Sequence, residues 1–309
     1  MELKVFGGQA SKELTEKICQ HLGIPVGITE FVEFSDGEFE VRFGENIRGR
    51  DVYIVQSTHA PAENLTELLL WIRAAKEATA GSITAVIPYF GWARGDRKAR
   101  SRVPIPAKLA ADVIAVAGAE HVLTVDLHAA QIQGFFDITV DHLYARPIFI
   151  KFFKENFNFE DFVVMGPDEG AVRLARSYAQ RLNARPVALA YKIRSGPDQI
   201  EVLEIVGNVQ DKNVLIVDDI VSTGGTITAL VDGLKKLGAK DIYAFCTHGI
   251  LCGDAISNIE KSPLSRLFVT DSVPSKKPSD KIQVISIAPL LFEAIKRTHN
   301  CESVSSLFE

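Results

Sequence analysis

Residues 214–230, VLIVDDIVSTGGTITAL, decide the fold. Four consecutive apolar residues predict a buried strand, and two aspartates stand at its carboxyl end. The serine, threonines and glycines that follow predict a turn that opens into a helix. A strand, a loop and a helix in this order are typical of a parallel α/β sheet.

The same alternation of β-branched runs and helical patterns continues on both sides of this stretch. In the first half it covers residues 52–56, 63–80, 83–88, 106–118 and 121–126. Beyond residue 145 it covers 162–167, 169–182, 186–191, 214–218, 226–237 and 241–247. We therefore expect two α/β, Rossmann-like domains, residues 1–145 and 146–309, each a mainly parallel sheet flanked by helices.

The composition excludes several classes of protein. The chain has 309 residues and a net charge of -5, which argues against a dedicated nucleic-acid binder. No apolar run suits a signal peptide or a membrane span, so we expect a cytoplasmic protein without membrane contact. Cys19, Cys246, Cys252 and Cys301 form no CxxC pair, so we expect reduced thiols and no zinc site.

The segment 218–226, here called the sugar-phosphate loop, has the composition of a phosphate site. Gly224 and Gly225 allow the backbone N–H groups, the neighbouring hydroxyls and the helix N-terminus to converge on one phosphate. Asp218 and Asp219 would then face the vicinal hydroxyls of the attached sugar. A simple helix cap is the alternative, but a cap needs one hydroxyl only. The candidate residues are Asp218, Asp219, Ser222, Thr223, Gly224, Gly225 and Thr226.

A second candidate site is the segment 88–106, here called the basic loop. It carries five cations against the single acid Asp96, namely Arg94, Arg97, Lys98, Arg100 and Arg102. We expect Gly91 and Gly95 to give it the freedom to close over a polyphosphate. The alternatives are a solvated charged loop or a nucleic-acid patch.

Four stretches together resemble the ribose-phosphate pyrophosphokinases, also called phosphoribosyl pyrophosphate synthetases. They are FSDGE at 34–38, PYFGWARGDRKARSRVPIPAKL at 88–109, VDLHAAQIQGFF at 125–136 and the sugar-phosphate loop. The similarity runs from Phe6 to ESVSSLF at 302–308. It implies two phosphoribosyltransferase-like domains, Mg²⁺, and transfer of the β,γ-diphosphate of ATP to the C1 hydroxyl of ribose 5-phosphate, with AMP as the other product.

The resemblance also implies roles for single residues. Lys192 and Arg194 would be catalytic, and His128 and Asp168 would contact the metal. The residues implied for ATP are Phe34, Asp36, Glu38, Arg94, Asp96, Arg97 and His128. Because the FSDGE residues would act on ATP held by a neighbouring subunit, the resemblance implies a homo-oligomer, a hexamer built from dimers.

Regulation by phosphate and ADP is implied by Arg48, Arg102, Ser303, Ser305 and Phe308, although Asn46 replaces the serine usual in the family. Three other positions depart from the family pattern. Gly95 stands where glutamine is usual, Ser222 replaces an aspartate, and residues 168–172, DEGAV, lack the second glycine.

Two other functions share parts of this pattern. A phosphoribosyltransferase would have the sugar-phosphate loop but would not need the basic loop or FSDGE. A noncatalytic, synthetase-associated regulatory relative would carry insertions in the catalytic segments, whereas the basic loop here is uninterrupted.

Overall fold

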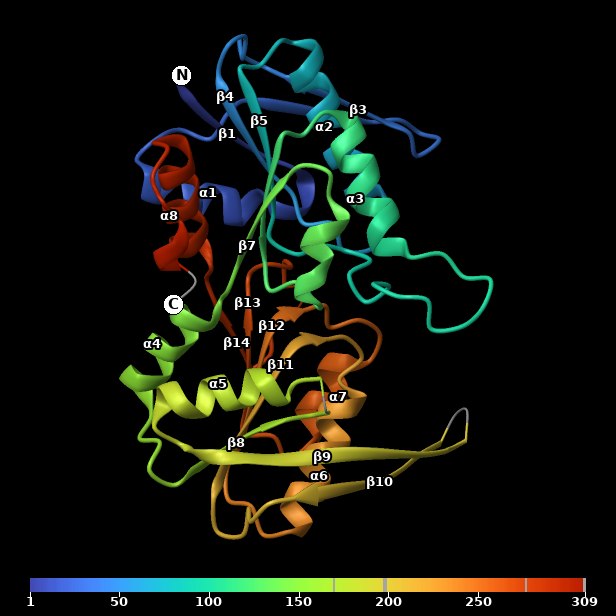
Figure 1. Cartoon of the computed structure of the whole chain (residues 1–309), viewed down its shortest axis with the longest axis vertical. Coiled ribbons are helices and arrows are strands. Elements are labelled where there is room, and N and C mark those ends of the chain that lie inside the picture. The colour runs from blue at the N-terminus through green and yellow to red at the C-terminus, as the bar shows by residue number, and fades with distance from the viewer. Residues whose placement is uncertain (169, 197–198, 276, 308–309) are drawn as a thin grey trace. The chain divides into compact units, whose positions relative to one another are not determined.

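The computed structural model describes residues 1–168, 170–196, 199–275 and 277–307, and only the backbone of residues 185–204 (Figure 1). The chain forms two compact units. Unit 1 comprises Met1–Ala145, Ser272–Pro274 and Ser286–Glu309, and unit 2 comprises Arg146–Asp271 and Ser275–Ile285.

Unit 1 is built on a five-stranded, wholly parallel sheet in the order β1-β4-β5-β6-β7. These strands are β1 (Leu3–Gly7), β4 (Asp51–Val55), β5 (Ser82–Ile87), β6 (His121–Val125) and β7 (Thr139–Leu143). An antiparallel hairpin, β2 (Thr29–Glu33) and β3 (Phe39–Phe43), stands apart from this sheet. β4 and β5 are buried along almost their whole length because helices cover both faces of the sheet.

The helices of unit 1 are α1 (Lys12–Leu22), α2 (Glu63–Glu77), α3 (Pro106–Ala117) and α8 (Ala288–His299). Short 3₁₀ turns lie at Gln9–Ser11, Ala130–Phe135 and Ser305–Leu307. In Figure 1, α1 and α8 lie on one side of the sheet, and α2 and α3 on the other. Pro106 starts α3 at its first turn, where a missing N–H costs nothing.

Unit 2 contains a seven-stranded sheet in the order β10-β9-β8-β11-β12-β13-β14. The strands are β8 (Phe162–Gly166), β9 (Arg185–Gly196), β10 (Gln199–Val206), β11 (Asn213–Val221), β12 (Ile242–Gly249), β13 (Arg266–Thr270) and β14 (Ile282–Ile285). Only the β9-β10 pair is antiparallel. The helices are α4 (Arg146–Asn156), α5 (Val172–Leu182), α6 (Gly225–Lys236) and α7 (Ala255–Lys261).

The expected fold class, α/β with two mainly parallel sheets flanked by helices, is confirmed. Two details differ from the sequence analysis. β11 continues to Val221, so Asp218 and Asp219 lie within the strand rather than beyond it. The last helix, α8, groups with unit 1 instead of the second half of the chain, because it packs against α1. No helix in the described ranges has the length and apolar character needed to cross a membrane.

Candidate active site

The sugar-phosphate loop has the turn that its glycines predict. Gly224 has φ 74°, in the left-handed region that favours glycine, and α6 begins directly afterwards at Gly225. Thr228 Oγ1 donates to the Gly224 carbonyl at 3.2 Å, which ties the turn to the first helical turn. The N–H groups at the start of α6 therefore follow directly on the hydroxyls of the loop, an arrangement that suits an anion.

Ser222 is held by a residue that the sequence analysis did not assign. Its Oγ lies 3.3 Å from Cys252 Sγ, and its carbonyl accepts a hydrogen bond from the Cys252 N–H at 3.0 Å. Cys252 lies between β12 and α7, thirty residues along the chain. No local sequence signal marks this contact, which connects the turn to the segment between β12 and α7.

Three carboxylates meet near the carboxyl ends of β8 and β11, which are neighbours in the sheet. Burial raises the pKa of Asp218 well above its usual value, and the charges of Asp219 and Asp168 raise it further. Asp168 follows β8, and its Oδ1 accepts the Ala171 N–H at 3.2 Å. The structure thus brings together Asp168, Asp218 and Asp219, at a cost in electrostatic repulsion that a bound cation would relieve.

The carboxylate oxygens of Asp168 are a ligand type that suits Mg²⁺, an ion that retains waters and substrate oxygens as further ligands. Among the residues that the structure describes, no three His, Cys, Asp or Glu side chains form a group that could hold a metal ion by themselves. A site of this kind would therefore be completed by the phosphates of a substrate.

In unit 1, His128 lies just beyond β6, at the carboxyl edge of the sheet, and is exposed. The turn before it contains Asp126 at φ 39°, whose Oδ2 accepts the Ala145 N–H at 3.1 Å. The buried His142 supports the same turn, since its Nε2 accepts the Leu127 N–H at 2.8 Å. His142 must therefore carry no proton on Nε2, and it positions the backbone next to His128.

The basic loop leaves the same sheet edge after β5. All five cations, Arg94, Arg97, Lys98, Arg100 and Arg102, are exposed, and none forms an ion pair with a described residue. Asp96 accepts a hydrogen bond from Gln131 Nε2 at 3.2 Å, which connects the loop to the segment that follows His128. The structure therefore brings the basic loop and the His128 segment together.

The two glycines at the base of this loop are closely packed. A Cβ on Gly91 would lie 1.9 Å from the Thr58 carbonyl oxygen, and one on Gly95 would lie 2.7 Å from Pro106 Cδ. Neither glycine has a positive φ. Both are required by close approach of the backbone, so any large motion belongs to the segment beyond Gly95.

The FSDGE segment forms the turn of the β2-β3 hairpin, as its glycine predicts. The Phe34 N–H donates to the Glu38 carbonyl at 2.8 Å, and Gly37 has φ 91°. Phe34 is 47% exposed, and Asp36 and Glu38 are also exposed. In Figure 1 the hairpin and the basic loop are separate projections of unit 1, so the chain does not bring these candidate ATP residues together.

Lys192 and Arg194 lie in β9, where their backbones pair with Leu203 and Ile200 of β10. Their side chains lie outside the described part of the chain. Phe308 also falls outside the described residues.

Two of the candidate regulatory segments meet in unit 1. The ring nitrogen Nδ1 of His299, at the end of α8, lies 2.6 Å from Asp51 Oδ2, at the start of β4. Arg48 lies shortly before Asp51 in the chain, and Ser303 lies shortly after His299. Ser303 accepts through its carbonyl from Arg297 Nη1 at 3.0 Å, and its Oγ accepts the Ser305 N–H at 3.2 Å.

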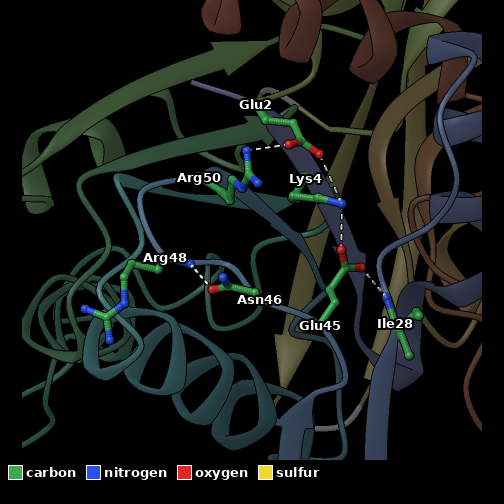
Figure 2. A network of polar contacts seen from close by, with 7 residues as sticks. All are labelled: Glu2, Lys4, Ile28, Glu45, Asn46, Arg48 and Arg50. Carbon is green, nitrogen blue, oxygen red and sulfur yellow. Dashed lines mark hydrogen bonds and ion pairs between the residues drawn. The ribbon is translucent and has the colours of Figure 1, made fainter.

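Figure 2 shows the network that fixes the segment around Arg48. Lys4 Nζ lies 2.6 Å from Glu45 Oε2, whose other oxygen accepts the Ile28 N–H at 2.9 Å. Burial alone would raise the pKa of Glu45, but the hydrogen bonds from Lys4 and Ile28 outweigh it and lower that pKa. The Arg48 guanidinium points away from this network and is exposed, whereas Asn46 Oδ1 accepts the Arg48 N–H at 3.1 Å.

Comparison with known proteins assigns the family. Two family models match the chain: the N-terminal domain of ribose phosphate pyrophosphokinase at residues 3–118, and the phosphoribosyl synthetase-associated domain at residues 193–309. A ribose-phosphate pyrophosphokinase of Listeria ivanovii is 49% identical over 100% of this chain and 98% of its own length. The corresponding protein of Clostridium tetani is 48% identical over 99% of this chain and 97% of its own. The chain belongs to the ribose-phosphate pyrophosphokinase family.

A solved structure supports the same assignment. The phosphoribosylpyrophosphate synthetase of Mycobacterium smegmatis superposes with a TM-score of 0.92 at 38% identity, covering 97% of this chain and 100% of that one. The similarity extends over both units, so the family fold includes both parallel sheets.

The departures from the usual ribose-phosphate pyrophosphokinase pattern have local explanations. At Gly95, any larger residue would have to displace Pro106, the first residue of α3. Ala171, at the position of the second glycine, is accommodated by Gly166, because a Cβ on Gly166 would lie 2.8 Å from the Ala171 Cβ. Ser222 uses its hydroxyl in the contact with Cys252.

Proposed function

We propose that this chain transfers the diphosphate group of Mg·ATP to the C1 hydroxyl of ribose 5-phosphate and releases phosphoribosyl pyrophosphate and AMP. In this reaction the C1 oxygen forms a bond to the β-phosphorus of ATP, and the bond between that phosphorus and the α,β-bridging oxygen breaks. The hydroxyl proton is released, and the product serves nucleotide biosynthesis. We further propose that the reaction takes place in the cytoplasm.

The observation that carries this proposal is the pair of phosphate-binding segments in one chain. The sugar-phosphate loop presents hydroxyls, N–H groups and two carboxylates, whereas the basic loop presents five exposed cations. A phosphoribosyltransferase needs only the first of these segments. A protein that joins a triphosphate to a sugar phosphate needs both, because each substrate brings its own negative charge.

Ribose 5-phosphate would bind at the end of β11. The phosphate would accept hydrogen bonds from the hydroxyls of Ser222, Thr223 and Thr226 and from the backbone around Gly224 and Gly225. Asp218 and Asp219 would accept from the vicinal ribose hydroxyls. Binding of these donors would stabilise the charged form of the carboxylates, offsetting part of the repulsion that raises the pKa of Asp218.

ATP would bind at the basic loop. Arg94, Arg97 and His128 would contact the triphosphate, and Asp96 would be oriented by its hydrogen bond from Gln131. Phe34 would stack on the adenine while Asp36 and Glu38 accept from its amino group. Because the hairpin is a separate projection of unit 1, we propose that these three residues serve the ATP of a neighbouring subunit in a homo-oligomer, a hexamer built from dimers.

His128 and Asp168 are each our candidates for contacting Mg²⁺, which would neutralise charge on the substrate phosphates when bound. Lys192 and Arg194 are our candidates for stabilising the charge that spreads over the β-phosphoryl oxygens during transfer. Arg48, Arg102, Ser303, Ser305 and Phe308 are our candidates for binding phosphate or ADP as effectors. The exposure of Arg48 supports the proposal that this residue binds such an effector.

The proposal is tested by measuring AMP release from ATP with Mg²⁺, with and without ribose 5-phosphate, at several phosphate and ADP concentrations. We expect AMP only when the sugar is present, with phosphate and ADP altering the rate. Intact ATP under all conditions would contradict the proposal. Activation of a partner synthetase by the inactive protein would instead support the noncatalytic regulatory alternative.

A further inference from the structure

Two neighbouring residues without an assigned role hold the base of the basic loop. Ser57 and Thr58 follow β4 at the carboxyl edge of the unit 1 sheet, beside the point where the basic loop leaves β5. Ser57 is 0% exposed and Thr58 is 3% exposed. Buried hydroxyls at such a position need hydrogen-bond partners, and here the basic loop provides them.

Four hydrogen bonds join this pair to the first residues of the loop, one of them from Thr58 Oγ1 to the Tyr89 carbonyl at 3.4 Å. The Tyr89 N–H donates to Ser57 Oγ at 3.1 Å, and the Gly91 N–H donates to Thr58 Oγ1 at 2.7 Å. The Thr58 N–H donates to the Tyr89 carbonyl at 3.0 Å. Gly91 also lies directly on the Thr58 carbonyl, as the 1.9 Å approach of an added Cβ shows. The base of the loop is therefore fixed by direct backbone contact.

Ser57 connects this base to two other segments. Its N–H donates to Ser11 Oγ at 2.9 Å, and its hydroxyl donates to the Ser272 carbonyl at 2.5 Å. Ser272 belongs to the short segment Ser272–Pro274 of unit 1, whose neighbours in sequence, Asp271 and Ser275, belong to unit 2. Ser57 is thus hydrogen-bonded both to the basic loop and to the short segment Ser272–Pro274.

We propose that Ser57 and Thr58 are positioning residues that orient the basic loop toward ATP. This inference rests on the proposed function, in which the basic loop binds the triphosphate. The cations beyond Gly95 are exposed and lose conformational freedom when they close on a ligand. A fixed base reduces the freedom that must be lost, which lowers the free-energy cost of ordering the loop around ATP.

The test compares Thr58→Val, which removes the hydroxyl at similar shape, with Thr58→Ser, which keeps it. Thr58→Val removes the hydroxyl oxygen that accepts the Gly91 N–H. We therefore expect the KM of this variant for ATP to rise about three- to tenfold. We expect the KM for ribose 5-phosphate to stay within about twofold of wild type, since no contact in its loop changes. Thr58→Ser restores the KM for ATP.

Ser11→Ala is the matched control, because it removes the acceptor of the Ser57 N–H without touching the basic loop. It lowers the melting temperature but leaves both KM values unchanged. If Thr58→Val does not fold, Ser57→Ala carries the same test, since it removes the acceptor of Tyr89.

Calorimetric binding of Mg·ATP to the same variants separates this inference from the proposed function. Wild-type protein that binds ATP but releases no AMP would contradict the reaction, and a weaker ATP affinity in Thr58→Val would still support the positioning role. An unchanged ATP affinity in Thr58→Val and Ser57→Ala would overturn the inference even if the wild type is fully active. An equal change in both substrates' KM values would also overturn it.

Discussion

The sugar-phosphate loop and the basic loop both lie at the carboxyl end of a strand with parallel neighbours, yet they are built differently. The sugar-phosphate loop takes its candidate groups from nine consecutive residues, 218–226, and from the start of α6. The basic loop is longer, and its base is held by Ser57 and Thr58, more than thirty residues earlier in the chain. The candidate groups of the first loop are neighbours in sequence, although Cys252 also holds Ser222, whereas the base of the second loop is held by residues far away in sequence.

The two loops also differ in their electrostatics. The sugar-phosphate loop gathers carboxylates, and burial and their mutual repulsion raise the pKa of Asp218. The cations of the basic loop are exposed, where water and salt reduce the cost of like charges. Changes in the first loop should therefore affect both sugar binding and stability, whereas changes at the tip of the second should affect ATP binding alone.

We propose that the two loops bind the substrates and that Lys192, which lies in neither loop, acts in the chemical step. We expect Lys192→Ala to lower kcat about 100- to 1000-fold, because one charge that stabilises the transition state is lost. Both KM values should change little. The measurement is steady-state kinetics of Lys192→Ala and of a control variant, Lys236→Ala, which changes an exposed lysine on α6. An unchanged kcat in Lys192→Ala would remove the residue from the mechanism.

Within the sugar-phosphate loop, Asp219→Asn should raise the KM for ribose 5-phosphate about 10- to 100-fold, as expected when a charged acceptor is lost. The KM for ATP should change much less. The control is Asp232→Asn, on the exposed surface of α6. Equal effects on both substrates would show that the two loops do not act separately.

At the basic loop, Arg97→Gln should raise the KM for ATP about tenfold at low ionic strength. The difference from wild type should shrink at high salt, because the exposed guanidinium acts through screened charge. The melting temperature should stay unchanged. Lys12→Gln, an exposed cation on α1, is the control, and a loss of stability in Arg97→Gln would contradict the picture of a structurally independent tip.

The smallest expected effect is on stability. Because the pKa of Asp218 is higher in the folded than in the unfolded chain, its favourable contribution is present below about pH 4 and is lost as the pH rises through the folded pKa. Asp218→Asn does not titrate, so at neutral pH it should be more stable than wild type by about 1 kcal/mol. Thermal unfolding of both proteins from pH 4 to pH 8 tests this. If the stability gain of Asp218→Asn over wild type shrinks as the pH rises, the prediction is contradicted.

These differences explain which features the sequence could predict. The strand, glycine turn and helix at 214–230 follow from local composition, and Gly224 has the predicted conformation. The proximity of Asp168 to Asp218 was not predicted, since it depends on β8 and β11 being neighbours in the sheet.

The contacts that were missed join residues far apart in sequence. Ser57 and Thr58 belong to an ordinary polar run, and only the fold brings them to Tyr89, Gly91 and Ser272. Gly91 seemed to offer freedom because a sequence does not show that its α-carbon faces a carbonyl oxygen. The amphipathic pattern of α8 likewise gives a buried face but not its partner, α1.

The most direct test of the central claim is phosphorus NMR of the complete reaction mixture of protein, Mg·ATP and ribose 5-phosphate. We expect AMP and a sugar carrying a diphosphate on C1 to appear in equal amounts, with no ADP. Formation of ADP with a sugar bisphosphate would show transfer of a single phosphoryl group and would contradict the proposed reaction.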